Sequence, residues 1–156
     1  MIFMLTSFIL SWIIFGLFAD KKRFLGQLPT CYFAMILGFL TDFLVEAYPL
    51  WEYTAANKWE HFFVEYLDEL GIYFVITYLF LQTLPKQKTF STMFLHIFIW
   101  TIPSLLIELV ALKIKAMEHH LWWNIYYSYI CDWFLYFIFY KHHQLYAKEF
   151  PSTTRP

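Results

Sequence analysis

Carboxylates inside apolar segments are the residues of this chain whose chemistry is most informative. They are Asp42, Glu46, Glu69, Glu108 and Asp132. An ionisable group within a bilayer costs at least ~2.5 kcal/mol, so each acid needs a partner, a proton or a water-filled cavity. Like charges that lie close together cannot all ionise. A group of such acids therefore either holds protons or attracts a cation.

Helical spacing aligns these acids with other polar or small residues. Residues four apart lie on one helix face, although that face drifts by ~40° per step. Such stripes comprise Ala34, Gly38, Asp42 and Glu46; Glu65, Glu69, Tyr73 and Thr77; Thr101, Ser104 and Glu108; and Asn124, Ser128, Asp132 and Tyr136. We expect these polar faces to turn inward, toward one another.

The stripes predict an acidic cavity in the outer half of a helix bundle. Its candidate ligand-binding residues are Asp42, Glu46, Glu69, Glu108, Asp132, Ser128 and Asn124. A structural alternative also fits the pattern, because each acid could bond neighbouring Tyr, Ser, Thr or Asn side chains and only fix helix packing.

The composition places this bundle in a lipid bilayer. The 156 residues are 60% hydrophobic, 24% aromatic and 15% charged. Soluble domains carry about a quarter charged residues. The net charge of −1 and the lack of a long basic run argue against a nucleic-acid partner. The sequence thus predicts one domain that faces lipid, with a homo-oligomer or a partner membrane subunit as possible protein partners.

The expected fold is all-α, an integral membrane bundle of about five transmembrane helices of ~20 residues each. The expected spans are 2–18, 29–50, 62–84, 90–112 and 121–140. The third span begins among Glu65, Asp68 and Glu69, so this segment is either interfacial or spanning. If it spans, those acids have to lie at or near the membrane surface.

Orientation follows from the basic residues in short connectors. One set of connectors and the tail 141–156 carry Lys21, Lys22, Arg23, Lys86, Lys88, Lys141, Lys148 and Arg155, whereas the other connectors carry only Lys58, Lys113 and Lys115. The sequence therefore predicts an N-terminus outside, a cytoplasmic C-terminus, and a multi-pass protein of the cell membrane.

Aromatic residues gather in the connectors that this orientation places outside. We expect an aromatic rim of Trp51, Trp59, Trp122 and Trp123. An aromatic belt at the membrane interface explains these residues without any ligand. The sharper alternative is an aromatic lid over a cationic guest.

Histidines and cysteines give weaker signals. The pairs His119-His120 and His142-His143 lie in polar connectors and are expected at the solvated surface, while His96 is expected to be a hydrogen-bonded packing residue. No histidine shares the expected depth of the acids, which disfavours a metal-dependent enzyme. Cys31 and Cys131 are expected at different depths and therefore free. No catalytic motif or cofactor-binding motif is present.

Short motifs in three parts of the chain carry a resemblance. They are Thr41-Asp42 with Leu50-Trp51-Glu52-Tyr53, Ile107-Glu108, and Trp123-Asn124-Ile125-Tyr126-Tyr127-Ser128-Tyr129. Over nearly its whole length the chain resembles a family of small, uncharacterised polytopic membrane proteins of endospore-forming Firmicutes. The resemblance implies a bacterial cytoplasmic membrane and carries over no catalytic residue.

Three functions remain open from the sequence. A binding or transport protein would take up a cation or a cationic small molecule from outside, or couple protons through Asp42 and Asp132. Transport by so small a bundle would require an oligomer. An accessory or scaffold subunit of a cell-envelope or spore-membrane complex would use the acids for helix specificity. A membrane enzyme would hold a metal with them.

Overall fold

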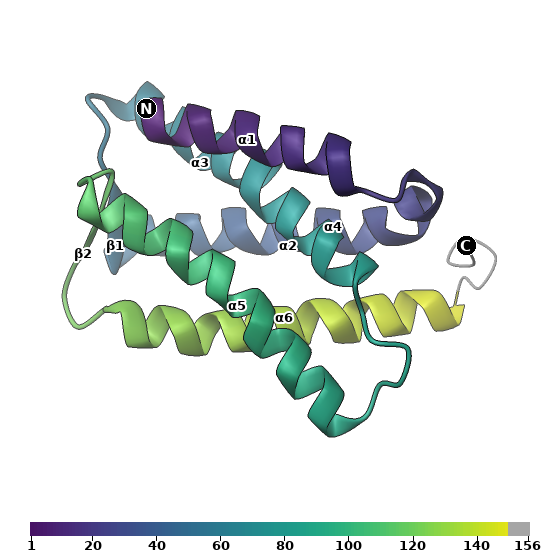
Figure 1. Cartoon of the computed structure of the whole chain (residues 1–156). Coiled ribbons are helices and arrows are strands. Elements are labelled where there is room, and N and C mark those ends of the chain that lie inside the picture. The colour runs from purple at the N-terminus through teal and green to yellow at the C-terminus, as the bar shows by residue number, and fades with distance from the viewer. Residues whose placement is uncertain (150–156) are drawn as a thin grey trace.

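The computed structural model describes residues 1–149, and five helical rods dominate it (Figure 1). The first two rods are α1 (Ile2–Phe18) and α2 (Phe24–Ala47), joined by a 3-10 turn, η1 (Lys21–Arg23). The third consists of α3 (Lys58–Leu67), the π-helix η2 (Asp68–Tyr73) and α4 (Phe74–Gln82). The last two are α5 (Phe90–Lys113) and α6 (Ile125–Glu149).

The helical prediction is largely confirmed, and its boundaries shift at three places. Helix α2 begins before Pro29 and ends at Ala47, rather than covering 29–50. Helix α6 starts at Ile125, after Asn124, and continues beyond residue 140 to Glu149. The first part of the expected tail 141–156 is therefore helical, while residues 150–156 lie outside the described part of the chain.

The third rod carries Asp68 and Glu69 at its middle, in the π-helix η2. Its helical path is continuous from Lys58 to Gln82. Asp68 and Glu69 are 8% and 1% exposed, so both acids are buried within the protein. The π-turn adds a residue to the helix locally, which changes the direction in which the following side chains point. Here it turns both acids into the protein interior.

A small antiparallel sheet was not predicted. Strands β1 (Trp51–Tyr53) and β2 (Met117–His119) pair Trp51 with His119 and Tyr53 with Met117. The sheet joins the connector after α2 to the connector after α5, at the same end as the N-terminus (Figure 1). The fold is therefore mostly helical rather than all-α.

Helix α4 forms the centre of the packing. It lies against α1, α2 and α6, and most of its side chains are buried. One apolar cluster joins it to α2, α5 and α6 around Phe80 and Tyr136, and a second joins it to α2 around Tyr78 and Cys31. His96 packs on the Phe80 ring and lies 3.1 Å from the Phe80 carbonyl oxygen, as expected for a packing residue.

Two helices are long and apolar enough to cross a membrane, namely Lys21–Ala47 and Phe90–Lys113. Helix α1 is also apolar but shorter. Large apolar side chains are exposed along α1, α2, α5 and α6, for example Leu17, Phe43, Phe90 and Phe134. Both cysteines are free, as expected, with Cys31 buried and Cys131 exposed.

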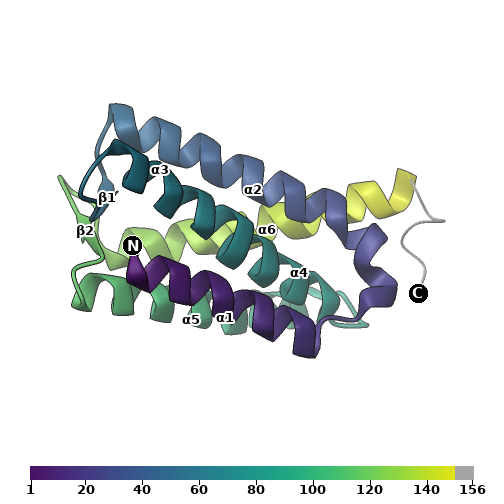
Figure 2. The ribbon, with the colours of Figure 1, turned by 90° about the horizontal axis from the view of Figure 1, so that it is seen from above.

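Basic residues gather at one end of the molecule, and the sheet lies at the other. The turns before α2 and after α4 lie at the same end as the last turns of α6, whereas the sheet lies at the opposite end (Figures 1 and 2). The first end holds the basic residues Lys21, Lys22, Arg23, Lys86, Lys88, Lys141 and Lys148. The sheet end holds the site described next.

Candidate functional site

A cavity of about 610 Å³ lies at the sheet end, between α2, η2, α5 and α6. The sheet covers one end of it through Trp51, Tyr53 and Met117. Its acidic lining residues are Asp42, Asp68, Glu69, Glu108 and Asp132. Most other lining residues are apolar, and none of those in the described part of the chain is basic. A volume of this size is typical of small-molecule sites.

Glu69 is the most deeply placed acid, and Gly38 provides the room for it. A methyl group built on Gly38 would overlap the Glu69 carboxylate, so the glycine leaves the space that this carboxylate occupies. Glu69 is 1% exposed, and its Oε2 has no hydrogen-bond partner among the described residues. A buried, unpaired polar atom is costly, so Glu69 calls for a proton or a ligand.

Asp42, one helix turn after Gly38 on α2, is also a buried acid with an unpaired oxygen. It is 9% exposed, and its Oδ2 has no hydrogen-bond partner within residues 1–149. Asp68, Glu65 and Glu46 are all near enough to repel its charge. The carboxylate therefore lies in a negative field that a cation would relieve.

Asp68 is partnered by a tyrosine of the sheet. The Tyr53 hydroxyl donates a 2.6 Å hydrogen bond to Asp68 Oδ2. Desolvation of the tyrosine, followed by the nearby charges of Asp68 and Asp42, raises the pKa of Tyr53 well above 10. The phenol therefore keeps its proton and remains a donor to Asp68.

Glu108, in contrast, finds its hydrogen-bond partners in a network of side chains. Its Oε1 accepts a 2.5 Å hydrogen bond from Ser128 Oγ and lies 2.7 Å from His119 Nε2. The Trp123 indole donates to Ser128 Oγ at 3.0 Å. This network joins α5, β2 and α6, so Glu108 and Ser128 have a packing role even without a ligand. Asp132, one turn beyond Ser128, lines the cavity and is half-buried.

Protein-family models, curated proteins and solved structures were all searched for relatives of this chain. None of them matches it. The resemblance to the membrane proteins of endospore-forming bacteria thus stays a prediction from short motifs.

The structure places two of the expected site residues outside the cavity. Glu46 is exposed and lies beside α3, because the stripe drifts around α2 between Asp42 and Glu46. Asn124 precedes α6 and accepts a hydrogen bond from the Tyr126 backbone N–H at 3.0 Å. A short polar side chain commonly fills this position before a helix, so the side chain of Asn124 serves the backbone.

The four tryptophans of the expected aromatic rim do not all lie at the cavity. Trp51 and Trp123 line the cavity and lie against each other, with ring centroids 4.9 Å apart. Trp122 is exposed and donates to the Tyr48 hydroxyl. Trp59 is 77% exposed on α3 and lines neither this cavity nor its edge. Of the four expected rim tryptophans, only Trp51 and Trp123 therefore line the cavity.

The expectation that both histidine pairs are solvated was wrong for three of the four. His119 faces Glu108 because neighbouring side chains of a strand alternate in direction. His142 lies 3.0 Å from the Thr30 hydroxyl and stacks on Phe33, and His143 is half-buried. His120 lies nearer the surface, 3.6 Å from Glu52.

Asp68 and Tyr53 were not selected from the sequence. Asp68 directly precedes Glu69 in an apolar segment, and that adjacency was a usable signal. Tyr53 reaches Asp68 only because a long-range strand pairing holds it over the cavity. No local pattern reveals such a contact.

Proposed function

We propose that this chain is a multi-pass membrane protein that binds, and in an oligomer could transport, a cationic molecule with an apolar body. The unpartnered carboxylate oxygens of Glu69 and Asp42 are the observation that carries the proposal. They lie in a cavity that holds acids and no basic lining residue among the described positions. A cation supplies the charge that these acids lack.

The apolar lining narrows the class of ligand. A small hydrated metal ion would leave most of a 610 Å³ apolar cavity without contacts. A cation with hydrophobic groups uses both features, because its charge meets the acids while its body packs on residues such as Ile72, Leu135 and Phe139. Trp51 and Trp123 add aromatic faces, which attract cations.

The membrane location rests on the outer surface and on the two ends. Apolar side chains are exposed along four of the rods, and two helices have the length and composition of spans. Soluble monomers rarely expose apolar patches of more than a few hundred Å². The basic residues lie at the end opposite the cavity, which favours a cavity on the outer side of a cell membrane.

The test uses two probes that differ mainly in charge. Methyltriphenylphosphonium is an apolar cation, and triphenylphosphine oxide is a neutral molecule of similar shape. We expect the phosphonium to raise the melting temperature of the detergent-purified protein and the oxide to leave it unchanged. Glu69→Gln and Asp42→Asn should melt higher than wild type without ligand, because a buried charge is removed, and should lose most of the phosphonium-dependent rise.

Glu118→Gln is the matched control, because Glu118 is an exposed acid of the sheet end outside the cavity. It should respond to the phosphonium as wild type does. A phosphonium effect of equal size in wild type, Glu69→Gln and Asp42→Asn would contradict the proposal. Melting that depends on pH but on neither probe would favour proton coupling. A melting temperature that depends on neither pH nor either probe would indicate that the acids only support packing, as in a scaffold subunit.

A further inference from the structure

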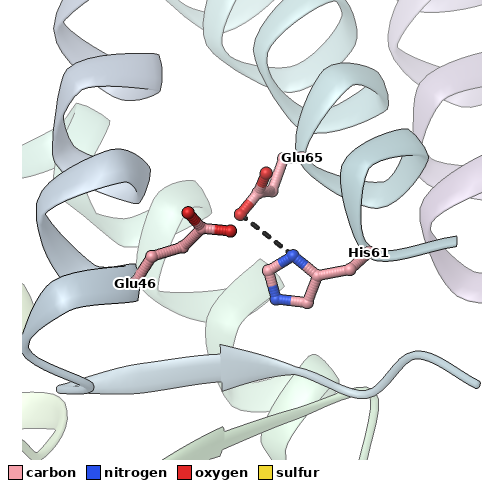
Figure 3. Close-up of side chains that lie close together, drawn as sticks. All are labelled: Glu46, His61 and Glu65. Atoms are coloured by element: carbon pink, nitrogen blue, oxygen red, sulfur yellow. Dashed lines mark ion pairs between the residues drawn. The ribbon is translucent and has the colours of Figure 1, made fainter. Parts of the chain in front are cut away.

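A second hollow, of about 540 Å³, lies beside the cavity at the sheet end, where α2 ends and α3 begins. Three metal-ligating side chains line it, namely Glu46, His61 and Glu65. They point toward one another from the two helices (Figure 3). One ligand atom from each lies within 4.8 Å of the other two. None of the three lines the acidic cavity.

Local structure sets this arrangement. Asn57 fixes the start of α3 by accepting hydrogen bonds from the backbone N–H groups of Trp59 and Glu60. His61 and Glu65 are four apart on this helix and so share a face. His61 Nδ1 lies 3.2 Å from Glu65 Oε1, with the side chains 24% and 16% exposed. Glu46 reaches the pair from the last turn of α2.

The geometry points to a site for one divalent transition-metal ion, such as Zn²⁺, held by Glu46, His61 and Glu65. Imidazole and carboxylate together suit first-row divalent ions. Zinc bonds of about 2.0–2.2 Å place ligand atoms roughly 3–4 Å apart. The His61–Glu65 separation already lies in that range. Glu46 is exposed, so rotation of its side chain can close the remaining gap.

Asp42 borders both the acidic cavity and this hollow. It is 9% exposed, and its Oδ2 has no hydrogen-bond partner in the described part of the chain. Its carboxylate adds negative charge beside the three proposed ligands, which favours a cation there. Lys58 also lines the hollow, but it is exposed, and no ion pair joins it to the three ligands within residues 1–149.

The metal site goes beyond the proposed binding of an organic cation and does not depend on it. Its ligands connect α2 to α3, whereas the cavity lies between α2, η2, α5 and α6. A bound ion would therefore stabilise the end of α2 and the start of α3 against each other. Glu46→Gln should leave the phosphonium effect in place, and Glu69→Gln should leave metal binding in place.

The experiment titrates tag-free, chelator-treated protein in detergent with Zn²⁺ by calorimetry, and with Co²⁺ by absorption spectroscopy. We expect one ion per chain for wild type. Glu46→Gln, His61→Ala and Glu65→Gln should each weaken binding by about tenfold or more, because each removes one of three ligands. His120→Ala is the matched control, since His120 also lies near an acid at the sheet end, 3.6 Å from Glu52.

Glu46→Gln decides the outcome if the other two variants fail to fold, because Glu46 is exposed and its replacement should be tolerated. Wild-type affinity in Glu46→Gln would overturn the site. So would a loss of binding in His120→Ala equal to that in His61→Ala. A wild type that binds neither ion would show that His61 only forms an ion pair with Glu65.

Discussion

Glu69 and Glu108 carry the same side chain in contrasting surroundings. Glu108 accepts from Ser128 and lies beside His119, so its position is explained by protein contacts. Glu69 is buried over a glycine with one oxygen unpaired. Two acids that look equivalent in the sequence thus differ in what they need, and only Glu69 calls for a proton or a guest.

Gly38 should be sensitive to a single added methyl group. We expect Gly38→Ala to destabilise the protein by about 1–3 kcal/mol, because the new Cβ overlaps the Glu69 carboxylate and displaces it. In a Glu69→Ala background the same substitution should cost much less, since the space is then free. Chemical denaturation of the four proteins in detergent gives the coupling free energy between the two positions.

Gly16 provides the control for that cycle. It lies within α1, and an added Cβ there meets nothing within 4 Å. Gly16→Ala should therefore be neutral or stabilising by up to about 1 kcal/mol, as in an open helix interior. Equal destabilisation at both glycines, or no coupling between Gly38 and Glu69, would mean that the carboxylate does not occupy the space beside Gly38.

At the scale of elements, the four-residue spacing brought most of the predicted acids to one cavity, although it failed for Glu46 on the regular helix α2. The four-residue spacing brought Glu108, Ser128 and Asp132 to one cavity, and these residues lie on uninterrupted helices. It missed Asp68, because a π-turn begins there and changes the helical phase. The spacing of residues in the sequence does not reveal the extra residue that the π-turn inserts.

The sheet and its contacts could not be predicted for a different reason. Each strand has only three residues, and Trp51 pairs with His119, which lies nearly half the length of the chain away in sequence. Such pairing depends on how α2 and α5 pack, and not on the residues near either strand. The placement of Tyr53 over Asp68 and of His119 against Glu108 follows from it.

The extension of α6 beyond residue 140 contains His143, whose titration can be tested. Burial, followed by the charges of Lys88 and His142, lowers the pKa of His143 from 6.5 to about 4. Between these values the folded protein keeps His143 neutral while the unfolded chain binds a proton. Unfolding then takes up a proton, so stability falls as the pH falls through this window.

We expect the melting temperature of wild type to drop between about pH 6.5 and about pH 4, and His143→Gln to drop less. His120→Gln is a suitable control, because His120 lies at the opposite end of the molecule near Glu52. It should follow the wild-type curve. Parallel curves for wild type and His143→Gln would show that His143 titrates alike in both states.

The whole molecule is polarised along its length. The sheet end combines the acidic cavity, the second hollow and the paired tryptophans Trp51 and Trp123. The opposite end carries most of the basic residues of the described chain. Because basic connectors tend to stay in the cytoplasm, we expect both candidate sites on the outer side of the membrane. In that orientation, a ligand or ion from outside would reach the acids without crossing the bundle.

Orientation can be tested with reporters that are active on one side only. A green fluorescent protein fused after Glu149, or inserted in the turn at Lys86, should fluoresce, because both positions are expected in the cytoplasm. An alkaline phosphatase inserted next to Ala56, in the exposed connector before α3, should be active. Phosphatase activity at Glu149, with none at Ala56, would reverse the protein in the membrane. The acidic cavity and the metal-ligating hollow would then face the cytoplasm, and their ligands would have to be sought among intracellular cations.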